Sequence, residues 1–273
     1  MNININWYPG HMKKTTESIK TNLKLVDIVY ELLDARIPYS SQNPSINTIL
    51  GQKKKIVVLN KSDLADPYTN NRWKKYYNEN GIDCVFLNSS IGDGIDELID
   101  LTKKTIDKKI IKVMIVGIPN VGKSTLINRI ANRKSTKTGN KPGITKSIQW
   151  INSNDGIYLL DTPGVLWPKF EEENVGLNLA FVGSIKDEIL DTLTLSLKLI
   201  EKLNSINKMF LISRYNLNNN IEEPDVILEN IALKRGCLLK GSILDLDKAA
   251  NIIIDDFRKG LLGRISLESP KEV

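Results

Sequence analysis

The segment 117–124, GIPNVGKS, matches the pattern GxxxxGK[ST] and constrains the fold more than any other part of the chain. The apolar run 112–116 precedes it and an amphipathic stretch follows, so we expect a loop between a strand and a helix. Backbone N–H groups of such a loop, with the helix N-terminus, bind phosphate. Lys123 is then expected to contact the β- and γ-phosphates and Ser124 to bind Mg²⁺. A glycine turn without a ligand is the alternative.

The first two-thirds of the chain alternate between β-branched apolar runs and amphipathic stretches. This alternation predicts an α/β fold with a mostly parallel sheet covered by helices on both faces. Ligands of such sheets bind beyond the carboxyl ends of the strands. The predicted strands are 27–33, 55–59, 84–87, 112–116, 147–151 and 157–160, and the predicted helices are 11–25, 69–80, 95–108 and 123–132.

The pattern changes after residue 173, where apolar residues take helical spacing over 174–203. Pro224 is expected to start a further helix that Gly236 ends, and Asp245 to cap another that runs to Gly260. We therefore predict two domains, an α/β domain over 1–173 and a small all-helical domain over 174–273.

The segment 60–63, NKSD, follows a predicted strand and indicates the base. The Asp63 carboxylate can accept hydrogen bonds from guanine N1–H and its 2-amino group, and adenine offers neither donor there. Asn88, Ser89 and Ser90 follow the next strand, where backbone N–H groups can meet guanine O6. NKSD alone is a weak match, but beside the phosphate loop it is strong. The predicted nucleotide-binding residues are Asn60, Lys61, Ser62, Asp63, Asn88, Ser89, Ser90, Asn120, Val121, Gly122, Lys123, Ser124, Thr125, Thr145 and Gly164.

The segment 161–164, DTPG, follows the last predicted strand. Asp161 is expected to hold Mg²⁺ through water, and the Gly164 N–H to contact the γ-phosphate. Thr145 is the candidate for a second hydroxyl on Mg²⁺. A β-turn is the alternative interpretation of each, and for Thr145 it competes well.

These five elements resemble those of the translation-factor-related P-loop GTPases, in an unusual order. NKSD and residues 88–90 precede the phosphate loop, so the chain looks like a circularly permuted GTPase. WYPGHM at 7–12, LDARIP at 33–38, NKSD, GIPNVGKST and GRISLE at 263–268 together resemble the ribosome biogenesis GTPase A family over essentially the whole chain. The resemblance implies GTP or GDP with Mg²⁺, and a GTP-hydrolysing factor for late maturation of the large (50S) ribosomal subunit. The precursor particle, with its rRNA and ribosomal proteins, would stimulate the GTPase.

The residue after DTPG is Val165, where many related GTPases carry the glutamine that orients the attacking water. His11 is the candidate replacement, because its imidazole is largely neutral at pH 7 and can bond water. The resembled family is thought to use this histidine in that role. His11 could instead cap the first helix or pack beside Trp7 and Tyr8. Asn120 supports a second hypothesis, K⁺ held near the phosphates, as in potassium-stimulated GTPases.

Charge and composition narrow the function classes. Lys and Arg number 38 and Asp and Glu 32, so the net charge of +6 is too mild to identify an anionic partner by itself. The basic residues on the predicted helical domain are consistent with rRNA binding. Two cysteines and one histidine exclude a disulfide framework and a histidine-rich metal site. No run is long and apolar enough for a membrane helix, so we expect a cytoplasmic monomer with no membrane partner.

Two other functions stay open from the residues alone. One is an RNA-modifying GTPase, although no nucleophile, metal cluster or second cofactor motif supports it. The other is a nucleotide-gated binding module without meaningful turnover, which Val165 would favour.

Overall fold

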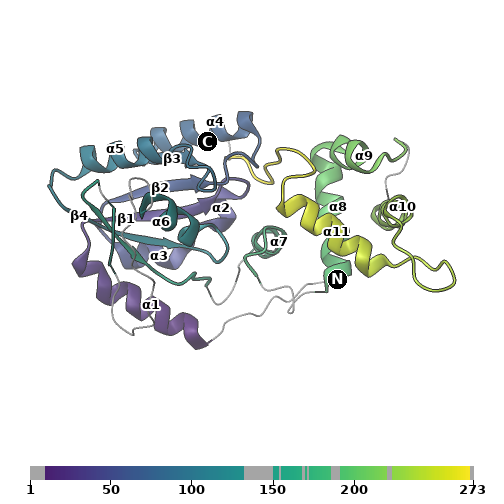
Figure 1. Cartoon of the computed structure of the whole chain (residues 1–273), viewed down its shortest axis with the longest axis horizontal. Coiled ribbons are helices and arrows are strands. Elements are labelled where there is room, and N and C mark those ends of the chain that lie inside the picture. The colour runs from purple at the N-terminus through teal and green to yellow at the C-terminus, as the bar shows by residue number, and fades with distance from the viewer. Residues whose placement is uncertain are drawn as a thin grey trace. The chain divides into compact units, whose positions relative to one another are not determined.

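The computed structural model describes residues 10–131, 150–153, 155–167, 170, 172–185, 191–219 and 223–270, with side chains from residue 16 onward. The chain divides into two compact units (Figure 1). The first spans Tyr8–Lys169 and also contains the C-terminal segment from Glu268, and the second spans Phe170–Leu267.

The first unit is built on a six-stranded sheet in the order β3-β2-β1-β4-β6-β5. Five strands are parallel, and only β5 runs antiparallel, beside β6. Every residue of β1 is buried, as expected for a central strand covered on both faces. The parallel strands lie within one residue of their predicted bounds, which confirms them. The strands are β1 (Ile28–Asp34), β2 (Lys55–Asn60), β3 (Cys84–Leu87), β4 (Ile111–Gly117), β5 (Trp150–Asn152) and β6 (Ile157–Asp161).

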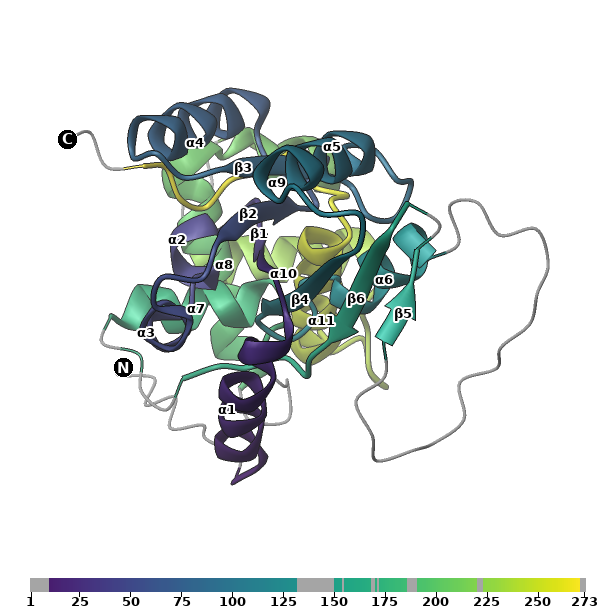
Figure 2. The same ribbon diagram turned by 90° about the vertical axis from the view of Figure 1, so that its left-hand side faces the viewer.

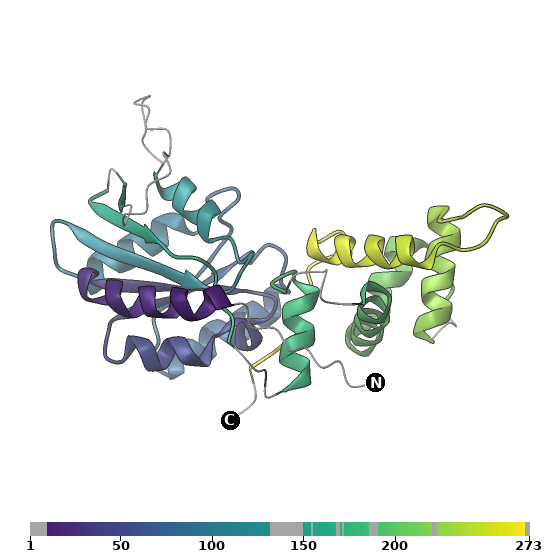
Figure 3. The ribbon, with the colours of Figure 1, turned by 90° about the horizontal axis from the view of Figure 1, so that it is seen from below.

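Helices cover both faces of this sheet, with α5 and α6 on one side and α1 and α3 on the other (Figures 2 and 3). The four predicted helices are present, and the 3₁₀ turn Leu23–Leu25 continues the first. Asp66 caps α4 by accepting a hydrogen bond from the Thr69 N–H at 2.7 Å, which places the helix start at Pro67, two residues before the prediction. The predicted helices appear as α1 (Gly10–Asn22), α4 (Pro67–Glu79), α5 (Ile95–Thr105) and α6 (Lys123–Ala131).

Two short helices between β1 and β2 were not predicted. They are α2 (Pro38–Ser41) and α3 (Pro44–Leu50), and each begins at a proline. The Asn43 side chain caps α3 by accepting from the Ser45 N–H at 3.0 Å. Both helices are too short for apolar periodicity to reveal them, so only the Asn-Pro pair signalled α3.

The second unit is helical. The predicted helical stretch 174–203 is in fact two helices, α7 (Glu173–Phe181) and α8 (Thr192–Asn207), because Asp191 starts a new helix by accepting from the N–H groups of its first turn. Gly236, with φ of 63°, ends α10 (Pro224–Arg235), and Asp245 caps α11 (Leu246–Arg258), as predicted. The unpredicted helix α9 (Met209–Tyr215) follows α8 after one residue.

The predicted division into domains at 173/174 stays a prediction. The compact helical unit begins and ends a few residues before the predicted helical domain, 174–273. The second unit begins at Phe170, and the chain returns to the first unit at Glu268. There the Glu268 carboxylate accepts from the N–H groups of Tyr39, at 2.8 Å, and Ser40, at 3.1 Å. No helix among the described residues is long and apolar enough to cross a membrane.

Candidate nucleotide-binding site

The predicted site segments leave the carboxyl ends of four parallel strands. The phosphate loop follows β4, NKSD begins at the last residue of β2, residues 88–90 follow β3, and DTPG begins at the end of β6. Parallel strands place these ends on one edge of the sheet. The topology therefore gathers segments that lie more than 100 residues apart in the sequence.

The phosphate loop has an unusual backbone. Gly122 has φ of 102° and Asn120 has φ of 58°, both in the left-handed region. A Cβ on Gly122 would lie 2.3 Å from Asn60 Nδ2, so no larger residue fits there without a shift. Lys123 then begins α6, as predicted.

The Lys123 ammonium lies against the loop itself. Its Nζ donates to the Ile118 carbonyl at 2.8 Å and to the Gly117 carbonyl at 3.2 Å. Burial lowers the pKa of Lys123 to about 8, although the nearby charge of Asp161 acts in the opposite direction. The loop therefore holds a desolvated cation, which suits a phosphate ligand.

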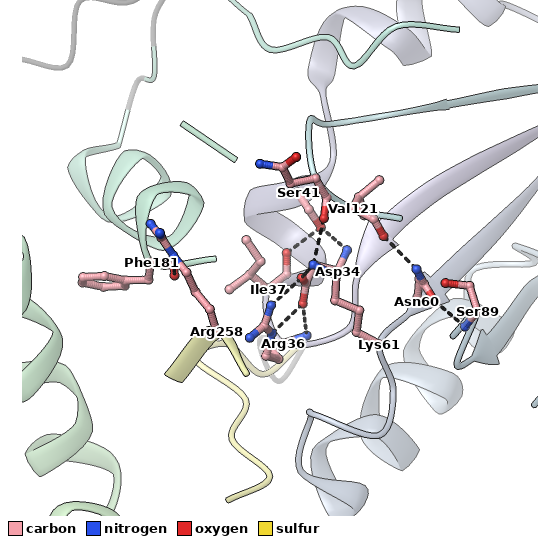
Figure 4. A network of polar contacts seen from close by, with 11 residues as sticks. Asp34, Arg36, Ile37, Ser41, Asn60, Lys61, Ser89, Val121, Phe181 and Arg258 are labelled. Carbon is pink, nitrogen blue, oxygen red and sulfur yellow. Dashed lines mark hydrogen bonds and ion pairs between the residues drawn. The ribbon is translucent and has the colours of Figure 1, made fainter. Parts of the chain in front are cut away.

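Asn60 joins three of the segments (Figure 4). Its Nδ2 donates to the Val121 carbonyl of the phosphate loop at 2.7 Å, and its Oδ1 accepts from the Ser89 N–H at 3.0 Å. The Ser62 N–H also donates to the Leu87 carbonyl, at 3.2 Å. Because Asn60 is buried, these bonds fix the base-side segments relative to the phosphate loop.

Lys61 makes a second connection to the phosphate loop. Its Nζ donates to the Asn120 carbonyl at 2.8 Å and lies 3.1 Å from Asp34 Oδ2. Asp34 also pairs with the Arg36 guanidinium at 2.8 Å. Burial alone would raise the pKa of the Asp34 carboxyl, but the charges of Arg36 and Lys61 hold it well below its usual range.

Asp34 and Arg36 were not predicted as site residues. Their sequence signal is a carboxylate at the end of a mostly apolar strand and a guanidinium two residues later, where buried charges are rare.

The predicted base-contacting residues are partly exposed at this edge, with Asn88 and Ser89 buried. Asp63 is exposed, and so is Ser90, whose N–H donates to Asn88 Oδ1 at 2.9 Å. Arg129 of α6 donates to the carbonyl of Ser90 and, at 3.4 Å, to that of Ser89. The Asp63 carboxylate is thus accessible, and the neighbouring loop 88–90 is held by Arg129.

DTPG packs tightly against the phosphate loop. A Cβ on Gly164 would lie 2.7 Å from the backbone of Pro119, and the Val165 N–H donates to the Gly117 carbonyl at 3.2 Å. Asn43 Nδ2 donates to the Val165 carbonyl at 3.3 Å, and the Val165 side chain is buried. Val165 is therefore part of the packing and presents no polar group to a water molecule.

The predicted Mg²⁺ ligands Ser124 and Asp161 are exposed on this edge, as is Thr125 beside Ser124. Neighbouring protein atoms partly desolvate the Asp161 carboxyl even though the residue is exposed, which raises its pKa, and the charge of Lys123 opposes this. A hydroxyl and a carboxylate are the hard oxygen donors that Mg²⁺ prefers, so the residues present fit this metal.

Two predicted residues are not tested by this geometry. Thr145 lies outside the described residues. His11 belongs to the first turn of α1, and its side chain lies outside the described part of the structure.

Comparison with known proteins gives consistent matches. A family model described as 50S ribosome-binding GTPase matches residues 112–229. A protein named ribosome biogenesis GTPase A from Priestia megaterium is 43% identical over 98% of both chains. One of the same name from Thermotoga maritima is 32% identical over 98% of this chain and 96% of its own. The crystal structure of GNP-bound YlqF from T. maritima covers 95% of this chain and 100% of its own at 28% identity, with a TM-score of 0.70.

Proposed function

The chain belongs to the ribosome biogenesis GTPase A family and is a GTPase of ribosome biogenesis, and from that premise we propose that it acts in late maturation of the large (50S) ribosomal subunit. Its GTP hydrolysis would be stimulated by that particle. The observation that carries the nucleotide part of this proposal is the bonding of Asn60 to both Val121 and Ser89, which holds three of the predicted segments together.

We propose that the base-side residues recognise guanine. The exposed Asp63 carboxylate would accept from N1–H and the 2-amino group. The N–H groups of residues 88–90 now donate to the Asp93 carbonyl, Asn60 Oδ1 and Asn88 Oδ1, so one of them would exchange its acceptor for guanine O6. Asn60 and Lys61 would hold these segments against the phosphate loop through their bonds to the Val121 and Asn120 carbonyls.

On the phosphate side, Lys123 would bind the β- and γ-phosphates, and the loop N–H groups of residues 120–125 would surround the phosphate oxygens. Ser124 and, through water, Asp161 would hold Mg²⁺, with Thr145 as a further ligand. When bound, Mg²⁺ neutralises charge that develops on the phosphates. The Gly164 N–H would contact the γ-phosphate, and its packing on Pro119 supports this position.

Hydrolysis needs a group that orients the attacking water. Val165 is buried and tied to Gly117 and Asn43, so it does not serve. We propose that His11, in the first turn of α1, supplies this group. K⁺ near Asn120 is a second proposal, and equal turnover in NaCl and KCl would contradict it.

The order of the segments supports circular permutation. NKSD precedes the phosphate loop in the sequence, yet β2 and β4 flank β1 in the sheet. Only residues 106–110 separate the end of α5 from the start of β4. A link of this length is enough to join the ordinary last helix to the ordinary first strand.

We propose that the helical unit contributes to rRNA and ribosomal-protein binding in the cytoplasm, with the protein acting as a monomer. Lys234, Lys240 and Arg264 are exposed on this unit and could contact phosphates. Arg258 has a different role, because it donates to the Ala180 carbonyl at 2.9 Å and the Phe181 carbonyl at 3.1 Å and so caps α7 (Figure 4).

The proposal is tested by the GTP hydrolysis rate alone, with isolated large ribosomal subunits, and with tRNA. Stimulation by the large subunit supports the assembly factor. Stimulation by tRNA alone would instead favour an RNA-modifying GTPase, and an unchanged rate in both mixtures would contradict activation by the particle.

A further inference from the structure

We propose that Asp34 is a positioning residue of the nucleotide site, which holds the Lys61 ammonium against the phosphate loop. This inference rests on the proposed nucleotide site. It concerns a carboxylate that lies outside the predicted base-binding, phosphate-binding and metal-binding residues.

The contacts run across three strand ends, and Figure 4 shows Asp34 with Arg36 and Lys61. Asp34 is the last residue of β1, which lies between β2 and β4. Its Oδ2 is 3.1 Å from Lys61 Nζ, and the same Nζ is 2.8 Å from the Asn120 carbonyl of the phosphate loop. The ammonium is therefore shared between a carboxylate and the loop.

Asp34 is itself held in place. Its Oδ1 accepts from the Arg36 N–H at 3.1 Å and from Arg36 Nε at 2.9 Å, and its own N–H donates to Ser41 Oγ at 3.1 Å. The side chain is 1% exposed. Because the carboxylate is fixed in this way, it can orient the Lys61 ammonium as well as attract it.

The ion pair with Arg36 already compensates the charge of Asp34. Lys61 adds a second cation to one buried carboxylate, and desolvating that ammonium is unfavourable. The gain is a fixed position for a flexible side chain. Lys61 and Asn120 both have backbones in the left-handed region, with φ of 59° and 58°. The hydrogen bond from the Lys61 ammonium to the Asn120 carbonyl links these two unusual turns. A loop ordered before its ligand arrives binds more tightly.

The same strand provides a matched control. Glu31 of β1 is also buried and pairs with Lys55 of β2 at 2.7 Å. Lys55 contacts Asn47 of α3 at 2.6 Å rather than any nucleotide loop. If buried ion pairs between β1 and β2 act only on stability, Asp34 and Glu31 variants will behave alike.

The test is the affinity for fluorescent GDP of the full chain, with Asp34→Asn, Lys61→Met, the double variant and Glu31→Gln. We expect Asp34→Asn to bind about ten-fold more weakly, which corresponds to about 1.4 kcal/mol. The double variant should bind no more weakly than Lys61→Met, because Asp34 acts through Lys61. Glu31→Gln should bind as the wild type does, even where its melting temperature falls.

Wild-type affinity in folded Asp34→Asn, or additive effects in the double variant, would overturn the inference. Should Asp34→Asn fail to fold, Asp34→Asn with Arg36→Met removes the whole buried pair and should show the same ten-fold loss. Wild-type affinity in that variant would also overturn it. A wild-type chain that does not bind guanine nucleotides refutes the proposed site itself, whereas additivity with intact wild-type binding refutes only the role of Asp34.

Discussion

The buried polar side chains of the first unit and those of the second are used differently. In the first unit Asn60 and Asp34 lie at strand ends, and they contact loops that leave other strands. Lys123, at the start of α6, bonds to the phosphate loop that precedes it. In the second, Asp256 of α11 accepts from Arg214 Nε at 2.8 Å and Tyr215 Oη at 3.0 Å, and so joins α11 to α9. Buried polarity therefore orders loops for a ligand in one unit and fixes helix packing in the other.

The largest expected effect concerns the rate of hydrolysis. If His11 orients the attacking water, His11→Ala should lower the hydrolysis rate with large subunits by about 100-fold, the lower range for loss of a positioned acid–base group. GDP affinity should be unchanged, because the base and phosphate contacts are intact. Single-turnover hydrolysis measures the rate, and GDP titration measures the affinity. A wild-type rate would leave His11 with only a structural role.

Base recognition should depend on a single carboxylate. Asp63→Asn removes a charged acceptor of two guanine hydrogen bonds, so GDP affinity should fall about 100-fold. Affinity for xanthine nucleotides should rise, because xanthine carries a carbonyl where guanine has its amino group. The matched control is Asp83→Asn, an exposed aspartate just before β3 and so at the amino ends of the strands. Equal losses in both variants would refute a specific contact.

In the helical unit, Asp256→Asn should act on stability alone. The variant weakens charge-assisted bonds to Arg214 and Tyr215, so we expect the free energy of unfolding to fall by about 2 kcal/mol. Denaturant titration measures this, and GDP affinity should stay within about two-fold of wild type, inside the usual variation at distant sites. A large loss of affinity would contradict the view that buried polar residues of the second unit act only on helix packing.

The smallest expected effect is a pH dependence at the phosphate loop. Because the pKa of Lys123 is lowered to about 8, its ammonium is largely protonated at pH 7 and largely neutral at pH 9. Phosphate binding favours the charged form, so GDP binding should take up close to one proton at pH 9 and almost none at pH 7. Affinity should fall about ten-fold over this interval, as one-proton linkage requires.

Calorimetry in two buffers of different ionisation enthalpy measures that proton uptake. The Lys123→Arg variant is the control, since a guanidinium stays charged throughout this range. Equal proton uptake by the variant and the wild type would assign the effect to another group.

Most strands and the site segments could be predicted because their signals are local. The apolar run of β4, the two glycines of the phosphate loop and NKSD each lie within a few consecutive residues. The role of Asp34 could not, because it depends on β1 lying between β2 and β4. The return of Glu268 to α2 also escaped prediction, since its partners Tyr39 and Ser40 are more than 200 residues away.

Amide hydrogen exchange with and without GDP tests most directly whether the segments at the carboxyl edge form one guanine nucleotide site. We predict that GDP slows exchange together at Ser62 and Asp63, at Ser89 and Ser90, and over residues 120–124. Protection confined to residues 120–124 would contradict base recognition by NKSD, because a ligand held only through its phosphates leaves the base-side loops unchanged.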